Sequence, residues 1–274
     1  MPTRRTFLSA ALAAGTGAVA ALPATASATP HLHRRVPRQS IGIQLYTLRD
    51  VMGDDPEPVL SALADIGYRR VELAGTYGRT AAEFARVLRR TGLRATSAHV
   101  GIDGDLDQVI ADARTLGHTY VVVPWADHAT LAGWRAFATR LEAAGEALRR
   151  AGLSLGYHNH AHEFAAVEGA RPFDVITSGT SRRNVHLELD LYWAVAGGVD
   201  PVALYREHFP RVRQFHVKDR APDGSFADPG EGTIDFARIF RSTGVAEYIV
   251  ENDQPADALA TARIGYDYLT RLRF

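Results

Sequence analysis

Short apolar runs rich in β-branched residues alternate along this chain with longer stretches in which Ala, Leu and Arg recur at helical spacing. Runs of the first kind are typical of buried strands, and stretches of the second kind are typical of amphipathic helices. The predicted strands are 41–46, 70–73, 95–99, 120–124, 153–158, 186–190, 213–218 and 248–251. The predicted helices are 56–66, 80–91, 106–116, 129–151, 172–177, 201–208, 235–241 and 257–272.

Eight strands that alternate with eight helices predict repeated βα units and a parallel sheet. In a chain of 274 residues this number of units indicates an α/β fold of the (β/α)8 TIM barrel type. No low-complexity linker divides the sequence after residue 40. We therefore predict one barrel domain over 41–274.

The period-two alternation of a strand predicts which side chains point into the barrel. In the fifth predicted strand the small residues Ser154 and Gly156 share a face with His158 and His160. A packed core does not tolerate inward polar groups unless they are hydrogen-bonded or bound to a ligand. The alternation therefore predicts a polar cup at one end of the barrel. Its other inward side chains are Gln44, Tyr46, Glu72, His99, Trp125, Glu188, Asp190, Gln214, His216, Lys218 and Glu251.

Side chains of the metal-ligand type stand at or near the ends of the last four predicted strands. In a parallel barrel these ends meet at one mouth. Asp190, His216 and Glu251 offer two carboxylates and an imidazole, a mixed set that suits Mn²⁺, Mg²⁺, Co²⁺ or Zn²⁺. A fourth ligand is expected from the fifth-strand region, where Glu163 and His158 compete for the position.

Six segments of the chain resemble the sugar phosphate isomerase/epimerase family. These xylose isomerase-like barrels include ketose 3-epimerases, inosose dehydratase and, more distantly, endonuclease IV. The resemblance covers roughly residues 41–274 and is specific at the level of the family, without fixing a substrate. The segments are 43–49 (IQLYTLR), 157–164 (YHNHAHEF), 187–190 (LELD), 215–219 (FHVKD), 230–236 (GEGTIDF) and 250–252 (VEN).

The resemblance implies roles for the ligand residues. In the epimerases of this family a glutamate, an aspartate, a histidine and a glutamate end strands five to eight; all four bind metal, and the glutamates exchange the substrate proton. Asp190, His216 and Glu251 match, with Glu251 as the general base, but His158 stands where the first glutamate is expected. Either Glu163 supplies that carboxylate from the following loop, or proton transfer uses one glutamate and a histidine. We predict Glu163 as the fourth ligand, and Glu163 or His158 as the partner acid.

Further polar and aromatic residues near the mouth are candidates for substrate binding. Lys218 could neutralise charge on a developing oxyanion, or it could pair with Glu188. Tyr46 and Trp125 could stack against the apolar face of a sugar, or they could simply pack at the rim. The predicted substrate-binding residues are Gln44, Tyr46, Glu72, His99, Trp125, His160 and Lys218.

The N-terminus carries the pattern of an export signal. Twin arginines, Arg4 and Arg5, precede Phe-Leu and an Ala-rich apolar stretch, and small residues at 26–28 form a cleavage pattern. We predict a Tat-type signal peptide over 1–28 and a disordered leader over 29–40, so the mature protein would be periplasmic or extracellular. No later segment reaches membrane-spanning length, and no stable membrane anchor is expected.

Charge and cysteine content narrow the function classes. The 31 basic and 31 acidic residues give zero net charge, which argues against a nucleic-acid partner. The absence of cysteine excludes disulfides and thiolate metal ligands. Export favours a free sugar over a sugar phosphate. The leading hypothesis is an exported, divalent-metal-dependent sugar isomerase or epimerase that transfers a proton through an enediolate.

The sequence is also consistent with two alternative functions. The first is a metal-dependent lyase or dehydratase of a keto-inositol or a 3-keto-glycoside, which would use the same metal and base. The second is a carbohydrate-binding barrel without catalytic activity, favoured by the missing fifth-strand glutamate. All three hypotheses have a small carbohydrate as the partner. The sequence leaves the oligomeric state open, with a homo-oligomer among the options.

Overall fold

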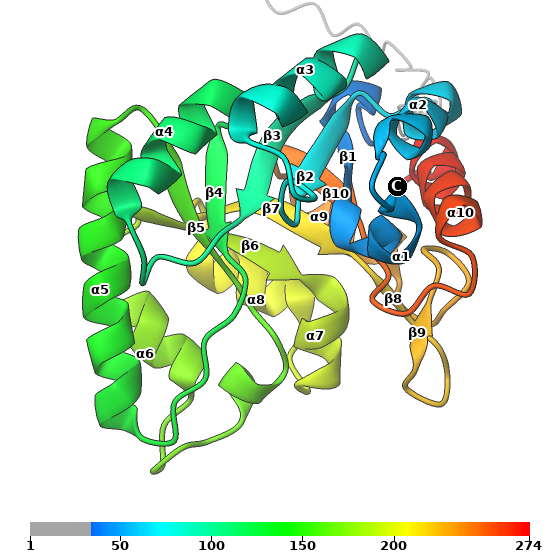
Figure 1. The fold of residues 1–274 in the computed structure, drawn as a ribbon. Coiled ribbons are helices and arrows are strands. Elements are labelled where there is room, and N and C mark those ends of the chain that lie inside the picture. Colours follow the sequence, from blue (N-terminus) through cyan, green and yellow to red (C-terminus); the bar gives the residue numbers. More distant parts are fainter. Residues whose placement is uncertain (1–33) are drawn as a thin grey trace, which may run out of the picture. The chain divides into compact units, whose positions relative to one another are not determined.

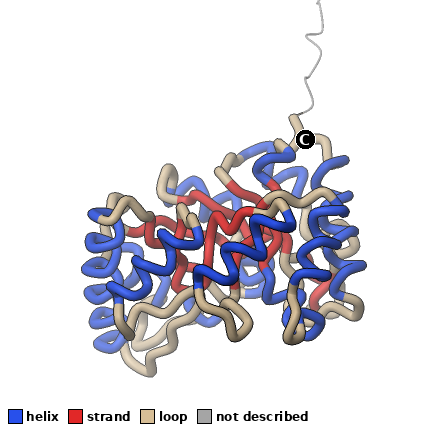
Figure 2. The backbone as a smooth tube through the Cα atoms, turned by 45° about the horizontal axis from the view of Figure 1, so that its top comes forward, coloured by secondary structure: helices blue, strands red, loops and turns tan. Residues whose placement is uncertain are grey.

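Eight parallel strands close a barrel in the computed structural model, which describes residues 34–274. The order around the barrel is β1-β10-β7-β6-β5-β4-β3-β2, so the first strand pairs with the last. Helices surround these strands in Figure 1 and in the tilted view of Figure 2. The barrel predicted from the alternating pattern is therefore confirmed.

The barrel strands are β1 (Ile41–Gln44), β2 (Arg70–Leu73), β3 (Arg94–His99), β4 (Tyr120–Val123), β5 (Ser154–His158), β6 (Val185–Asp190), β7 (Val212–Val217) and β10 (Glu247–Val250). A separate antiparallel hairpin consists of β8 (Asp219–Arg220) and β9 (Phe226–Ala227). The helices are α1 (Arg49–Met52), α2 (Glu57–Ile66), α3 (Ala81–Thr91), α4 (Leu106–Leu116), α5 (Leu131–Arg150), α6 (Pro172–Gly179), α7 (Leu191–Ala196), α8 (Pro201–His208), α9 (Phe236–Ser242) and α10 (Ala258–Arg271). Short 3-10 helices lie at Arg38–Ser40, Leu45–Leu48 and His162–Phe164.

Local signals set the ends of several elements. Thr80 and Glu83 form a capping box that starts α3, and the Asp105 side chain accepts hydrogen bonds from the first turn of α4. β1 ends at Gln44 rather than at Tyr46, because the Gln44 side chain accepts a hydrogen bond from the Tyr46 backbone N–H and starts a 3-10 turn. The predicted strand was too long there because this turn interrupts its apolar run.

None of the helices within residues 34–274 combines the length and the apolar character needed to span a membrane. The predicted signal peptide over 1–28 lies outside the described residues, as does the first part of the predicted leader. The described part of the leader differs from the disordered segment expected. Arg34 and Phe274 exchange two backbone hydrogen bonds, and Val36 is buried in the core. The first and last of the described residues are thereby held together.

The barrel interior is polar even at the end opposite the mouth. His186 of β6 bonds through Nε2 to Gln214 Oε1 at 2.9 Å, and Gln214 donates to Glu247, which pairs with Arg70. Gly156 makes room for the His186 ring, since a Cβ atom there would lie 2.5 Å from Nε2. Each of these four side chains thus has a partner, which removes most of the cost of its desolvation.

Burial at this end of the barrel makes the stability of the protein sensitive to acid. Burial lowers the pKa of His186 to about 4, whereas an unfolded chain has a histidine pKa of about 6.5. Between these values the unfolded state takes up a proton that the folded state does not, so stability falls as the pH drops from about 6.5 to 4. The loss from this one group is about 3 kcal/mol. Urea unfolding at several pH values should show that the free energy of unfolding falls less steeply with decreasing pH in His186→Gln than in wild type. Equal slopes for the two proteins would contradict this assignment.

Candidate metal and active site

Four side chains of the metal-ligand type meet where strands β5, β6, β7 and β10 end. His158 ends β5, Asp190 ends β6, His216 lies near the end of β7, and Glu251 directly follows β10. One potential ligand atom from each lies within 4.8 Å of the others, and all four residues are buried. The structure therefore brings together three of the predicted ligands, with His158 as the fourth member of the group.

Glu163 is not part of this group, contrary to our prediction of the fourth ligand. It lies in the 3-10 helix that follows β5, and it is fully buried. The Tyr157 hydroxyl donates to its Oε1 at 2.7 Å, and the His160 backbone N–H donates to its Oε2 at 2.8 Å. Burial raises the pKa of the Glu163 carboxyl. Both carboxylate oxygens thus have partners beside the barrel mouth, and Glu163 holds the loop that carries His160.

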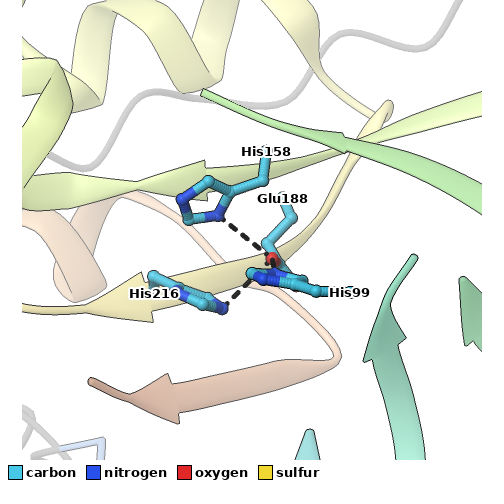
Figure 3. A group of neighbouring side chains, drawn as sticks. All are labelled: His99, His158, Glu188 and His216. Atoms are coloured by element: carbon cyan, nitrogen blue, oxygen red, sulfur yellow. Dashed lines mark hydrogen bonds and ion pairs between the residues drawn. The ribbon is translucent and has the colours of Figure 1, made fainter. Parts of the chain in front are cut away.

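A single oxygen of Glu188 lies among three imidazoles, one layer deeper in the barrel (Figure 3). Its Oε1 is 2.9 Å from His99 Nε2, 3.1 Å from His158 Nδ1 and 3.1 Å from His216 Nε2. These four residues form a second group whose potential ligand atoms lie within 4.8 Å of one another. The groups share His158 and His216, so Glu188 orients two rings that also face Asp190 and Glu251.

Lys218 places a buried ammonium group beside the carboxylates of the first group. Its Nζ lies 3.0 Å from Asp190 Oδ2, 2.7 Å from Glu251 Oε2 and 2.9 Å from Asp253 Oδ1. Burial alone would lower the pKa of Lys218, but these three carboxylates raise it. Of the two roles considered for this lysine, the pairing with Glu188 is not seen. The charged ammonium instead faces the mouth.

Neighbouring charges shift the pKa values of the residues in the first group. Burial alone would raise the pKa of Glu251, but Lys218 and His216 hold it well below its usual range. Burial alone would lower the pKa of His216, but Glu188 and Glu251 hold it well above its usual range. Burial raises the pKa of Asp190 to about 6, and the nearby Lys218 opposes this rise. Glu251 is therefore an ionised carboxylate at neutral pH.

The first group fits a divalent cation. Its two carboxylates and two imidazoles are donors that Mn²⁺, Co²⁺ and Zn²⁺ accept, and His216 would release its extra proton when a cation binds. Burial, together with the nearby His216, lowers the pKa of His158 to about 3, which leaves the neutral imidazole that binds metal. Asp190 Oδ2 is buried and accepts no hydrogen bond, although the Lys218 ammonium is close. A buried carboxylate oxygen with unused acceptor capacity is what a cation would engage.

A cavity of about 640 Å³ opens above the two groups. His158, Lys218 and Glu251 reach its floor, while Trp125 and Tyr46 stand on its walls with 54% and 43% of their surfaces exposed. This exposure sets the two aromatics apart from the buried core. Of the residues predicted to bind substrate, those that line the cavity are Tyr46, His99, Trp125, His160 and Lys218.

Gln44 and Glu72 do not line the cavity, although we predicted them to bind substrate hydroxyls. Both are fully buried beneath its floor, where Gln44 Nε2 donates to Glu72 Oε2 at 2.9 Å. The same Glu72 oxygen lies 2.6 Å from His216 Nε2. Burial raises the pKa of Glu72. Gln44 and Glu72 lie in β1 and β2, one layer below the mouth. Their side chains therefore support the His216 ring from below and do not reach the cavity.

The sequence analysis did not predict every residue that lines the cavity, and Asp253, Arg49 and Phe226 are among those missed. Asp253 stands two positions after Glu251, so extending the period-two pattern past the strand would have found it. Arg49 closes one of the family-like segments. Phe226 carried no signal, because it reaches the cavity through the short β8–β9 hairpin, which has no hydrophobic periodicity.

Comparisons with known proteins agree with the barrel fold. Residues 60–244 match the family described as xylose isomerase-like TIM barrel. The rhizopine catabolism protein MocC of Rhizobium meliloti is 29% identical over 80% of this chain and 82% of its own length. The inosose dehydratase of Geobacillus kaustophilus is 26% identical over 79% of this chain and 87% of its own length.

A solved structure shows the same fold. A sugar phosphate isomerase/epimerase from Parabacteroides distasonis is 26% identical and superposes with a TM-score of 0.74, covering 85% of this chain and 98% of that one. The family match, which spans more than half of the sequence, agrees with the closed parallel barrel and with the resemblance noted in the motifs. This chain belongs to the xylose isomerase-like TIM barrel family.

Proposed function

We propose that this protein is a metal-dependent lyase that performs β-elimination on a keto-cyclitol or keto-sugar. The observation that carries the proposal is that the His158 imidazole lies at the position of the first epimerase glutamate, while Glu163 is held away from the group by Tyr157. Transfer of a proton between two faces of a sugar carbon is served best by two matched carboxylate bases. Elimination needs one base and one proton donor. The similarity to an inosose dehydratase also supports elimination.

Each side chain at the cavity floor has a role in this reaction. Glu251, ionised and exposed to the cavity, removes the proton next to the substrate carbonyl. The Lys218 ammonium stabilises the negative charge that develops on the carbonyl oxygen. His99 lines the same cavity; burial alone would lower its pKa, but Glu72 and Glu188 raise it, which makes His99 a donor to the departing oxygen.

The metal would be held by His158, Asp190, His216 and Glu251. When bound, a divalent cation there supplies Lewis-acid polarisation of the carbonyl and a neighbouring hydroxyl. Mn²⁺, Co²⁺, Zn²⁺ and Mg²⁺ are all candidates, and the two imidazoles favour the first three. Glu188 and Glu72 hold the imidazole rings in the orientation that this set requires.

The product of the reaction distinguishes lyase from isomerase. Metal-loaded protein, incubated in D₂O with a keto-inositol, is expected to give a product lighter by one water, as measured by mass spectrometry. A product of unchanged mass that carries deuterium would favour the isomerase or epimerase reaction instead, in line with the solved isomerase/epimerase that this chain resembles. A protein that binds no metal and changes no substrate would favour the binding barrel.

We also propose that the protein is located outside the cytoplasm. The twin-arginine pattern at Arg4 and Arg5 supports export. Sugar phosphates are scarce in that compartment, so a non-phosphorylated substrate is expected. Fractionation of cells that express the full chain, compared with an Arg4→Lys/Arg5→Lys double variant, tests this point. The wild-type protein should be found outside the cytoplasm and the variant inside.

A further inference from the structure

Aromatic rings form a continuous arc along one wall of the mouth cavity. The Trp125 ring lies 4.7 Å from that of His160, the His160 ring lies 5.3 Å from that of Trp193, and the Trp193 ring lies 5.6 Å from that of Phe226. The four residues come from separate parts of the barrel rim: the β4 and β5 ends, α7, and the β8–β9 hairpin. All four line the cavity. The fold thus brings four aromatic residues from distant parts of the sequence together on one wall of the cavity.

A second aromatic surface follows β1, which lies across the barrel from β5. The guanidinium of Arg49 lies 4.1 Å from the centre of the Tyr46 ring. Two backbone carbonyls fix this guanidinium, since NH1 donates to Tyr46 O and NH2 donates to Asp253 O, both at 2.8 Å. Tyr46 and Trp125 are also two of only four large hydrophobic side chains that are exposed within residues 34–274. Exposure of these two rings at one cavity indicates a ligand surface.

The cavity is larger than the proposed reaction needs. The reacting sugar ring would occupy the polar floor, where His99, Lys218 and Glu251 lie. The volume of about 640 Å³ falls in the middle of the range found for pockets that hold drug-sized ligands. A single cyclitol at the floor would leave the aromatic walls without a partner. Aromatic side chains stack against the apolar faces of sugars and of aryl groups.

We infer that the substrate is a keto-glycoside whose second ring, sugar or aryl, lies between these aromatic walls, so that the leaving group is this ring rather than water. The inference rests on the proposed lyase function. Glu251 takes the proton from the carbon between the carbonyl and the glycosidic carbon. The electron pair left on this carbon forms a double bond to the glycosidic carbon, the glycosidic C–O bond breaks, and the leaving oxygen receives a proton. The products are an unsaturated keto-sugar and the free second ring, with no oxidant or water consumed.

Binding of unreactive ligands tests the second-ring site without any turnover. Isothermal titration of the metal-loaded protein with glucose, cellobiose and p-nitrophenyl β-glucoside is expected to show about tenfold tighter binding for at least one glycoside than for glucose. Trp125→Ala should weaken binding of that glycoside more than binding of glucose, so that the advantage is lost. Phe209→Ala is the matched control, because Phe209 is an exposed aromatic that follows α8, away from the mouth, and it should bind as wild type does.

The outcomes separate this inference from the proposed function. Equal affinity for glucose and both glycosides, or an equal loss of all three in Trp125→Ala, would overturn the second-ring site even if a keto-inositol is dehydrated. Glycoside binding without release of p-nitrophenol from the 3-keto form of the aryl glucoside would leave the site standing and overturn the elimination. A preference for cellobiose identifies a sugar as the second ring, and a preference for the aryl glucoside identifies an aryl group.

Discussion

Replacement of Glu251 by glutamine is expected to lower kcat by a factor of about 10²–10⁴, the usual contribution of a positioned general base. Lys218 and His216 keep this carboxylate ionised, and it is exposed to the cavity floor. Glutamine has a similar shape but cannot accept the proton. Because Glu251 is also a proposed ligand, kcat has to be measured at saturating metal, with the metal content of each sample determined.

Glu247→Gln is the matched control for this experiment. Glu247 is also a buried glutamate of β10, but it lies at the other end of the barrel, where it bonds with Gln214 and Arg70. This variant should lose some stability and keep its kcat within a few-fold of wild type. Near-normal turnover in Glu251→Gln at full metal occupancy would exclude Glu251 as the base. A histidine at the cavity floor would then be the candidate base.

Loss of the His158 imidazole is expected to weaken metal binding by more than about 100-fold. Replacing residues that only support metal ligands typically costs 10–100-fold in affinity, and removing a ligand itself should cost more. Glu163→Gln should change the affinity by only a few-fold, because its carboxylate is held by Tyr157 and by the His160 backbone. Competition between the protein and a chelator for Mn²⁺ measures both variants at one pH.

The contrast between these two variants decides which residue is the fourth ligand. The reverse pattern, with a large loss in Glu163→Gln and a small one in His158→Ala, would mean that Glu163 turns into the group when metal is present. A carboxylate pair would then be restored, and the isomerase or epimerase reaction would gain over elimination. Equal small losses would place the cation elsewhere, with the Glu188 group of imidazoles as the next candidate.

The sequence predicted the fold well because the barrel depends on local patterns. Hydrophobic runs and capping residues such as Thr80 and Asp105 set the elements, and the period of two correctly placed Asp190 and His216 at the mouth. The short α1 and α7 helices and the β8–β9 hairpin were missed. These segments are too short to show a period, and specific side chains set them; Asp190, for example, caps α7.

The contacts among the predicted site residues could not be derived from the sequence. Glu163 was predicted as a ligand because of its charge and its place after β5, but the hydroxyl of Tyr157, a residue of β5 itself, donates a hydrogen bond to it. Lys218 was considered a partner of Glu188, yet three imidazoles surround that carboxylate. In both cases several polar partners lay within reach, and only three-dimensional packing decides which of them comes within hydrogen-bonding distance.

The position of β1 between β10 and β2 has a consequence for how the chain reaches its native state. During synthesis β2 to β7 can pair in order as they emerge, but β1 gains its second neighbour only when Glu247–Val250 has been made. Until then β1 and β7 both expose an unpaired edge, the feature that most readily recruits other chains. A chain truncated before β10 would therefore be an aggregation-prone open sheet, and only a full-length chain can hide both edges.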